Sequence, residues 1–263
     1  LFSFRYSSCC SNGTVALHLA LLALNIGPGD EVIVPSFTYI ASVNCVSYVG
    51  ATPRFADSAT ADWCIDTESI LSLVNPSTKA VIVVHLYGVV FDVEFLRSKL
   101  PSHIHIIEDC AEALGSQGAA GYRLGTASDI CTFSFFGNKT LTTGEGGMVC
   151  TNNHKIHNLV NRFKSQALDP NGPEYTHDLI GFNYRLTNLS AAIGCAQLDR
   201  FNEIASRKRA INKLYYDSLS NLFRFQFHSD HVNNLQWLTT FLCPEHIKRS
   251  DLRLYLFHRG IDT

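Results

Sequence analysis

The chain has 263 residues, of which 46% are hydrophobic and 17% are charged, a balance typical of a globular protein with a sizeable core. Its formal net charge of −2 gives no sign that a nucleic acid or a membrane surface is its partner. No apolar run reaches the roughly 18 residues that a membrane span needs. The nine cysteines include no Cys-x-x-Cys pair and mostly lie in apolar segments, so we expect reduced cysteines in a cytoplasmic protein.

The first part of the chain alternates short apolar strands with helices. The expected elements, in chain order, are helix 15–24, strand 31–34, helix 40–49, strand 53–56, helix 67–74, strand 79–86, helix 91–99, and strands 103–109, 129–135 and 147–151. Because these strands are apolar on both faces, they predict an α/β fold whose mostly parallel sheet is covered by helices on both sides.

The pattern changes after residue 152. The sequence predicts helix 154–165, a polar loop over 168–178, one long helix over 188–219, a strand within 234–242 and helix 249–260. A helix of that length often bridges two domains, so we expect a large domain over 1–200 and the start of a small α+β domain over 201–263. The chain begins with Leu1 and stops at Thr263 without a closing element, and we expect both domains to be incomplete.

One lysine, Lys139, lies in a glycine-rich loop between the last two strands of the first part. A lysine there fits two interpretations. It could protect the edge of a β-hairpin. It could also be a nucleophile or a Schiff-base former, which requires desolvation or a neighbouring cation to lower its pKa.

Three further features fall where strands of such a sheet end, the usual place for ligands. Ser11-Asn12-Gly13-Thr14 opens a buried helix and could bind an anion, or Ser11 or Asn12 could simply cap the helix. Asp109 ends an apolar strand and must be paired, with a protonated ring nitrogen, an arginine or a helix cap. Ser134 lies five residues before Lys139, and its hydroxyl could join the anion site.

The sequence contains neither the dinucleotide fingerprint G-x-G-x-x-G nor the nucleotide loop G-x-x-x-x-G-K-[ST]. His103 and His105 share a strand without a third ligand in sight, so we expect no metal site. A phosphate site, an aspartate for a pyridinium nitrogen and a lysine for an imine are the parts that pyridoxal phosphate needs.

Seven segments carry a resemblance to a known family: residues 11–14, 35–39, 84–88, 108–113, 125–126, 133–148 and 181–188. They resemble the DegT/StrS family of sugar-nucleotide aminotransferases, pyridoxal phosphate enzymes of fold type I, over about residues 8–263. Residues 108–113 and 133–148 are most similar to the branch that makes perosamine. The resemblance implies a three-layer sandwich as the large domain and a homodimer with shared active sites.

The resemblance also implies a role for single residues. Lys139 matches the lysine that bonds to the cofactor, Asp109 the partner of the pyridinium nitrogen, and Tyr39 an aromatic that stacks on its ring. Further matches are phosphate contacts at Gly13, Thr14 and Ser134, a position near the ring at Glu112, and Asn183 reaching the phosphate in the neighbouring subunit.

The function that the resemblance implies is transfer of an amino group from L-glutamate to a nucleotide-linked 4-keto-6-deoxy sugar, which by closest resemblance is GDP-4-keto-6-deoxymannose. Three alternatives stay open. The sugar could carry UDP or dTDP instead of GDP. A related branch of dehydratases has histidine in place of the lysine, and Lys139 argues against it. A non-catalytic remnant would fit the cut ends and Val89-Val90-Phe91, which stand where the family usually has a polar residue and a proline.

Overall fold

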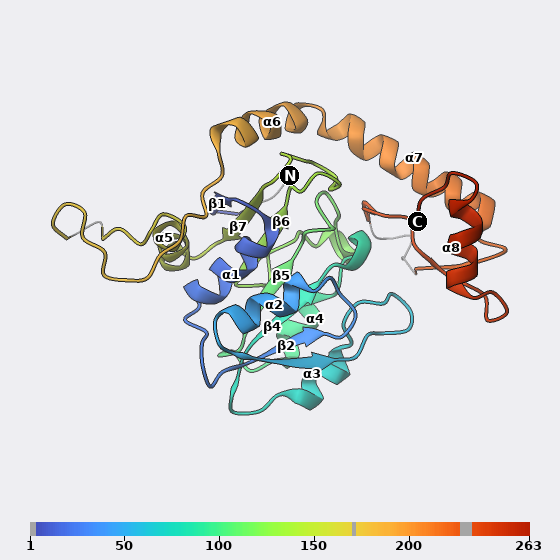
Figure 1. Cartoon of the computed structure of the whole chain (residues 1–263). Coiled ribbons are helices and arrows are strands. Elements are labelled where there is room, and N and C mark those ends of the chain that lie inside the picture. Colours follow the sequence, from blue (N-terminus) through green and yellow to red (C-terminus); the bar gives the residue numbers. More distant parts are fainter. Residues whose placement is uncertain (1–3, 170–171, 227–232) are drawn as a thin grey trace.

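A seven-stranded sheet forms the centre of the computed structural model, which describes residues 4–169, 172–226 and 233–263 (Figure 1). The strands are β1 (Tyr6–Cys10), β2 (Glu31–Pro35), β3 (Thr52–Ala56), β4 (Thr78–Val84), β5 (His105–Asp109), β6 (Ile130–Ser134) and β7 (Gly147–Thr151). Their order across the sheet is β1-β7-β6-β5-β4-β2-β3. All neighbouring pairs are parallel except those of β7, which runs antiparallel to β1 and β6. The predicted α/β fold with a mostly parallel sheet is confirmed.

Strand β1 was not expected from the sequence. Its residues, Tyr-Ser-Ser-Cys-Cys, carry little of the β-branched and aromatic character that marks a strand. It forms because its backbone pairs with β7 along its whole length, from Tyr6 opposite Thr151 to Cys10 opposite Gly147. This long-range pairing places residues 11–14, which follow β1, at the same end of the sheet as the loop after β6.

The helices of the large body are α1 (Gly13–Ala23), α2 (Ala41–Tyr48), α3 (Thr67–Leu73), α4 (Val93–Lys99) and α5 (His154–Phe163). Helix α1 packs on β6 and β7 and is flanked by α2 and α5. It is buried on nearly all sides, as its apolar sequence predicts.

The long helix predicted over 188–219 is two helices. Helix α6 (Asn188–Asp199) begins at Thr187, whose side chain accepts a hydrogen bond from the Ser190 amide, and α7 (Phe201–Leu219) follows after a break at Arg200. No side chain in α6 is buried, whereas Phe201 and Ala205 at the start of α7 are. The break lets the chain turn these two side chains toward the core. Figure 1 shows both helices (orange) running along one side of the body.

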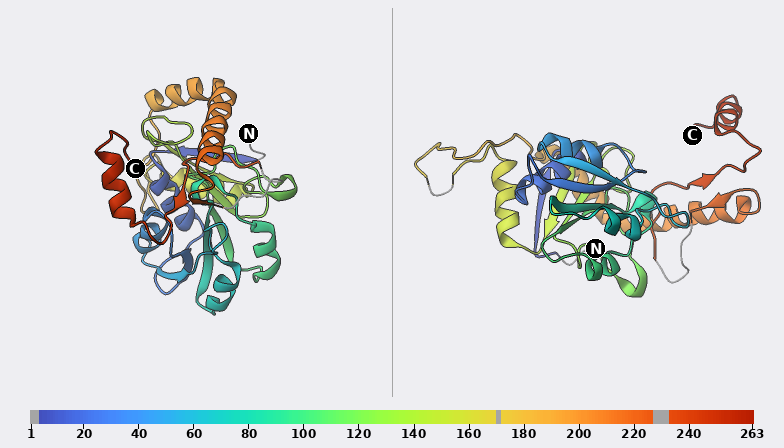
Figure 2. Two further views of the ribbon diagram at one scale, coloured as in Figure 1. Left: turned by 90° about the vertical axis from the view of Figure 1, so that its right-hand side faces the viewer. Right: turned by 90° about the horizontal axis from the view of Figure 1, so that it is seen from below.

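In the described part of the C-terminal region, β8 (Arg224–Phe225) and β9 (Phe241–Leu242) form a small sheet, which is followed by α8 (Arg249–Phe257). The strand predicted within 234–242 is therefore limited to its last two residues. Figure 2 shows α8 standing away from the body on the side opposite α5. Residues 170–171 of the predicted polar loop and 227–232 of the predicted small domain lie outside the described residues. Within the described ranges, no helix is long and apolar enough to cross a membrane.

Candidate active site

Lys139 lies in the loop that joins β6 to β7, at the end of the sheet where the parallel strands stop. Both of these strands have neighbours on either side, so the interpretation of Lys139 as protection for a sheet edge is wrong. The Lys139 amide donates to the carbonyl of Phe136 at 2.9 Å and so closes a tight turn. The turn follows the rigid strand β6 directly, which fixes the position from which the side chain extends.

The amino group of Lys139 lies 3.6 Å from the centre of the Trp237 ring, which comes from the segment between β8 and β9. Burial lowers the pKa of Lys139, and the carboxylates of Glu112 and Asp109 offset part of that effect. The desolvation that a lysine nucleophile requires is therefore present. The two carboxylates come from the end of β5 and the loop after it.

Asp109 is the last residue of β5 and is buried. Its two oxygens accept hydrogen bonds from the Ser42 hydroxyl, at 2.7 Å, and from the Ala111 amide, at 3.1 Å. Both donors are neutral. A protonated ring nitrogen would therefore find a carboxylate whose negative charge these two contacts leave uncompensated.

Glu112 lies three residues beyond Asp109 and is also buried. Its carboxylate accepts a hydrogen bond of 2.6 Å from the amide of Tyr87, a residue with a backbone φ of 55°. Burial raises the pKa of Glu112 to about 7, although the Tyr87 amide and the charge of Lys139 act in the opposite direction. The side chain can therefore hold or release a proton near neutral pH beside Lys139.

Gly13 and Ser134 meet at the start of α1. A Cβ added to Gly13 would lie 2.7 Å from the Cβ of Ser134 and 3.1 Å from its Oγ, closer than side chains pack. The predicted cap is present as well, since the Asn12 side chain accepts from the Val15 amide at 2.9 Å. This cap uses the Val15 amide, so a phosphate could bind to the amides of Gly13 and Thr14 and to the Ser134 hydroxyl.

Tyr39 and Asn183 lie farther out. Tyr39 precedes α2, the helix that carries Ser42, and is 73% exposed. Asn183 is exposed too, and it pairs through a single β-bridge with Ser165 just beyond α5. Tyr39 thus comes three residues before Ser42, whose hydroxyl bonds to Asp109. Asn183 faces solvent, where a second subunit could use it.

A buried network lies behind the site on β4 and β5. Phe91 donates its amide to His85 Nδ1 at 3.1 Å, so His85 Nε2 carries the proton and donates to Glu108 at 2.8 Å. The other oxygen of Glu108 accepts from the Tyr122 hydroxyl and the Gly125 amide, both at 2.9 Å. One potential metal-ligand atom from each of His85, Glu108 and Cys110 lies within 4.8 Å of the other two, a spacing that a metal ion could use. The hydrogen bonds described above, however, already occupy the imidazole and the carboxylate.

Sequence reasoning missed Ser42, Trp237 and the His85–Glu108 pair. The one usable signal was that Ser42, in the first turn of α2, comes only three residues after Tyr39, which precedes that helix. Trp237 carried no signal because it lies 98 residues after Lys139 in the sequence, and only the folded chain brings the two side chains together.

The profile of the DegT/DnrJ/EryC1/StrS aminotransferase family matches residues 3–263. The chain belongs to this family. It is 47% identical over 260 residues to the GDP-perosamine synthase of Escherichia coli O157:H7, covering 98% of this chain and 71% of the relative. The GDP-perosamine synthase of Vibrio cholerae is 43% identical over 264 residues, with 98% and 71% covered.

Solved structures of family members have the same fold. The DesV enzyme of S. venezuelae superposes with a TM-score of 0.90 at 33% identity, over 99% of this chain and 69% of that one. The putative sugar aminotransferase Spr1654 of Streptococcus pneumoniae, in its PLP-form, gives 0.89 at 26% identity over 98% and 72%. The prediction that the chain is a pyridoxal phosphate-dependent sugar aminotransferase of this family is confirmed.

The residues at the sheet end fit the cofactor of this family. The close approach of Gly13 to Ser134 leaves backbone amides and a hydroxyl together at a helix start, a set of donors suited to a phosphate. Asp109 has neutral partners, and Lys139 is partly desolvated between two carboxylates and an aromatic ring. These are the groups that a phosphate, a pyridinium nitrogen and an aldehyde would each require.

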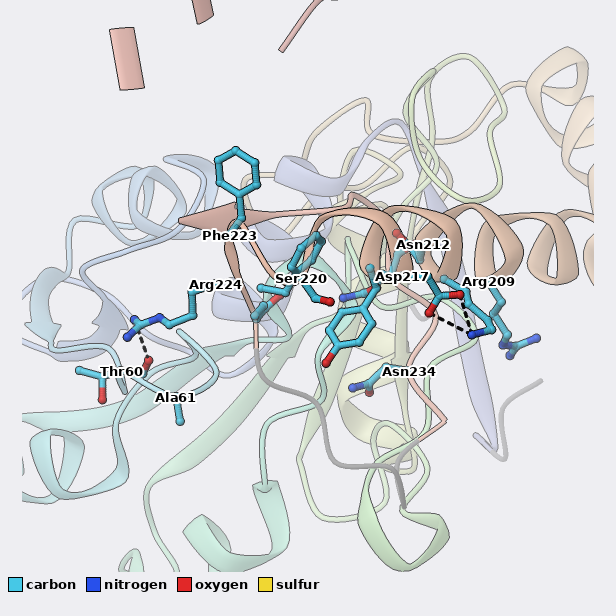
Figure 3. Close-up of a pocket in the computed structure, with 14 residues that line it drawn as sticks. Thr60, Ala61, Arg209, Asn212, Asp217, Ser220, Phe223, Arg224 and Asn234 are labelled. Carbon is cyan, nitrogen blue, oxygen red and sulfur yellow. Dashed lines mark hydrogen bonds and ion pairs between the residues drawn. The ribbon is translucent and has the colours of Figure 1, made fainter. Parts of the chain in front are cut away.

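A separate cavity of about 990 Å³ lies between the carboxyl half of α7 and the loop at residues 60–61 (Figure 3). Its lining contains neither Lys139, Asp109 nor Glu112. Asn234 and Gln236 line it, and Gln236 directly precedes Trp237, whose ring contacts Lys139. The segment 234–237 therefore contacts both this cavity and Lys139 at the carboxyl end of the sheet.

Proposed function

We propose that this aminotransferase moves an amino group from L-glutamate to GDP-4-keto-6-deoxymannose, which yields GDP-perosamine. The support is the 47% and 43% identity to two relatives named GDP-perosamine synthase over nearly the whole chain. A relative named as a UDP-N-acetyl-3-dehydro-alpha-D-glucosamine 3-aminotransferase shares 39% over 215 residues. This relative supports a UDP-linked keto sugar as the second candidate substrate, whereas a dTDP-linked 4-keto sugar rests on the family resemblance alone.

In this proposal Lys139 is the catalytic residue. Its Nζ would hold the cofactor and would move a proton at the reacting carbon of the substrate. The cofactor supplies an electron sink for the charge that develops on the substrate. Asp109, oriented by Ser42, keeps the ring nitrogen protonated so that this sink is effective. The observation that carries the assignment is that Lys139 lies close enough to Asp109 and Glu112 for both carboxylates to interact electrostatically with its amino group.

The remaining residues bind and orient the cofactor. Gly13, Thr14 and Ser134 hold its phosphate at the start of α1. Glu112 lies beside the ring and, in its protonated form, can donate a hydrogen bond that a glutamine could also provide. The exposed ring of Tyr39 covers the cofactor from the solvent side.

The test uses the purified protein and pyridoxal phosphate. We expect the absorbance of cofactor bound to a lysine, absent in Lys139→Ala and retained in the surface control Lys155→Ala. An unchanged spectrum in Lys139→Ala would refute the lysine assignment. L-glutamate should then convert the bound cofactor to its amine form. Mass spectrometry of products from GDP-, UDP- and dTDP-linked 4-keto sugars identifies the substrate.

The non-catalytic alternative loses one of its arguments. Val89 and Phe91, which depart from the family pattern, are both buried. The Phe91 amide bonds to His85, and the Val89 carbonyl accepts from the Cys64 thiol at 3.7 Å. The departure thus fills the core. Binding of cofactor without conversion by L-glutamate would revive this alternative.

We also propose a homodimer in which Asn183 reaches the cofactor phosphate of the partner subunit. The support is apolar side chains at the surface near Asn183 in sequence: Ile180 is 85% exposed and Leu189, on α6, is 82% exposed. Coexpression of Lys139→Ala with Asn183→Ala should restore about one quarter of wild-type activity through mixed dimers, although each variant alone is inactive. Sedimentation as a monomer, or no restoration, would refute the shared site.

The division into a large domain over 1–200 and the start of a small domain from 201 belongs to the same proposal. Strands β1 to β7 fall in the first range, and β8, β9 and α8 in the second. A cytoplasmic location is supported by the nine cysteines, all of which are free. Expression of a tagged chain with fractionation of the cell tests the location.

A further inference from the structure

Trp237 connects three separate parts of the chain. Its indole nitrogen donates to the carbonyl of Asn138 at 2.7 Å, and its ring lies under the amino group of Lys139. Its backbone amide donates to the carbonyl of Tyr87 at 2.9 Å, in the turn that Glu112 holds. Its backbone carbonyl accepts from Lys208 Nζ of α7 at 3.1 Å. The ring therefore has a defined position relative to the lysine.

The segment before Trp237 is firmly attached to the large body. Leu235 is fully buried, and its amide donates to the Ser116 hydroxyl at 2.8 Å. The carbonyl of Asn233 accepts from the Gln117 amide at 3.0 Å. A Cβ on Gly88 would lie 2.5 Å from the Leu235 carbonyl, which shows how closely the two backbones approach. The indole is thus carried by a segment that packing and hydrogen bonds fix in place.

The contact between Lys139 and Trp237 is electrostatic as well as steric. The face of an indole is negative and attracts an ammonium group, more strongly where water is excluded, as it partly is here. The charged groups that also act on Lys139 are Glu112, from the loop after β5, and Asp109, at the end of β5. The Trp237 ring lies 3.6 Å from the amino group, so it limits where the flexible lysine side chain can move.

We propose that Trp237 is a positioning residue for Lys139: its indole holds the lysine amino group at the carboxyl end of the sheet and stabilises the ammonium form. The proposal rests on the proposed function insofar as that assigns Lys139 the catalytic role. It adds that a residue of the C-terminal part of the same chain controls the position and the protonation of the Lys139 amino group. Leucine at this position keeps an apolar cover over the lysine and removes the face of the ring, so the ammonium form loses the attraction of the indole while most of the burial is kept. More of the reactive amine is then present at a given pH.

The test measures the reactivity of Lys139 in the cofactor-free full chain. A pulse of acetic anhydride across pH 7 to 11, with peptide mapping by mass spectrometry, gives the acetylation of Lys139 relative to the exposed Lys155. At pH 8 we expect Trp237→Leu to raise the relative rate about two- to tenfold. Trp237→Phe, which keeps an aromatic face and the cover over the site, should raise it less.

The sequence has two tryptophans, and Trp63→Phe is the matched control because Trp63 is buried in another part of the fold. It should leave the Lys139 rate unchanged. It also leaves Trp237 as the single tryptophan, whose fluorescence should change as Lys139 loses its proton. Lys139→Met should abolish that change.

A Lys139 rate that is unchanged or lower in both Trp237 variants would overturn the proposal, as would fluorescence that does not respond to Lys139. If Trp237→Leu lowers the melting temperature sharply, the Lys139 acetylation rate in Trp237→Phe decides whether the proposal holds. None of these measurements uses the cofactor. Failure of the lysine assignment would appear instead in the absorbance test, so the two failures are distinguishable.

Discussion

The hydroxyl of Ser42 donates a hydrogen bond of 2.7 Å to the carboxylate of Asp109 where both side chains are buried. The bond joins the first turn of α2 to the end of β5. Ser42 Oγ also lies 3.3 Å from the hydroxyl of Thr38, so its own position is supported. The orientation of the Asp109 carboxylate is therefore set by a helix that approaches from a different part of the sheet.

Replacement of Ser42 by alanine should weaken cofactor binding about ten- to a hundredfold, because a hydrogen bond to a charged group contributes roughly 1.5–3 kcal/mol. Titration of the cofactor-free protein with pyridoxal phosphate, followed by absorbance, gives the dissociation constant. Ser47→Ala, an exposed change on the same helix, is the control. Equal dissociation constants for the two variants would show that Ser42 does not orient Asp109.

Gly13→Ala should damage both stability and phosphate binding. The new methyl group would lie 2.7 Å from the Cβ of Ser134, so β6 or α1 must shift, at a cost of about 1–3 kcal/mol. Urea unfolding and cofactor titration measure the two effects. In Gly27→Ala the added Cβ would lie 3.7 Å from the Val49 carbonyl, an ordinary contact, so this control should be nearly neutral. Recovery of stability in Gly13→Ala with Ser134→Gly would confirm the cause.

Much of this site could be predicted from the sequence because parallel strands bring their carboxyl ends to one edge. Asp109 ends β5 and Ser134 ends β6, both strands that the sequence predicts, and Gly13 lies at the predicted start of α1 although the strand before it was not expected. Ser134 lies close enough to Gly13 for its hydroxyl to join that helix start. The roles of these residues stay predictions.

The parts that the sequence did not reveal depend on long-range packing. The break at Arg200 is invisible in a continuous helical pattern, since it arises where Phe201 turns into the core. Trp237 lies in an apolar run that predicted a strand, but its backbone bonds to a loop of the large body instead. Local pattern cannot decide between two sets of backbone partners that are both distant in sequence.

The pKa of Glu112 predicts how stability depends on pH. Its rise from an ordinary 4.5 to about 7, caused by burial, corresponds to about 3 kcal/mol. The unfolded chain releases this proton near pH 4.5, whereas the folded chain keeps it until about pH 7. The protein therefore loses stability as the pH rises from about 4.5 to about 7, and above pH 7 the ionisation of Glu112 causes no further loss.

Glu112→Gln removes that dependence, so the variant should gain stability relative to the wild type between pH 5 and pH 8. Thermal unfolding of the cofactor-free protein at both values measures the difference. Glu145→Gln, an exposed change in the loop after Lys139, should show no such gain. If the difference in stability between Glu112→Gln and the wild type is the same at pH 5 and at pH 8, the raised pKa of Glu112 is contradicted.

The buried pair of His85 and Glu108 yields a prediction for the core behind the site. The amide of Glu108→Gln can turn its NH₂ toward the N–H of His85, whose proton cannot move because Nδ1 already accepts from the Phe91 amide, or toward the N–H of Gly125. In either orientation two donors face each other. A buried donor is left unsatisfied, so we expect a loss of about 1–3 kcal/mol in urea unfolding. Tyr122→Phe removes only one of two donors to the other oxygen and should cost less. The exposed control Glu174→Gln should be neutral, and an equally neutral Glu108→Gln would mean that His85 reorients freely.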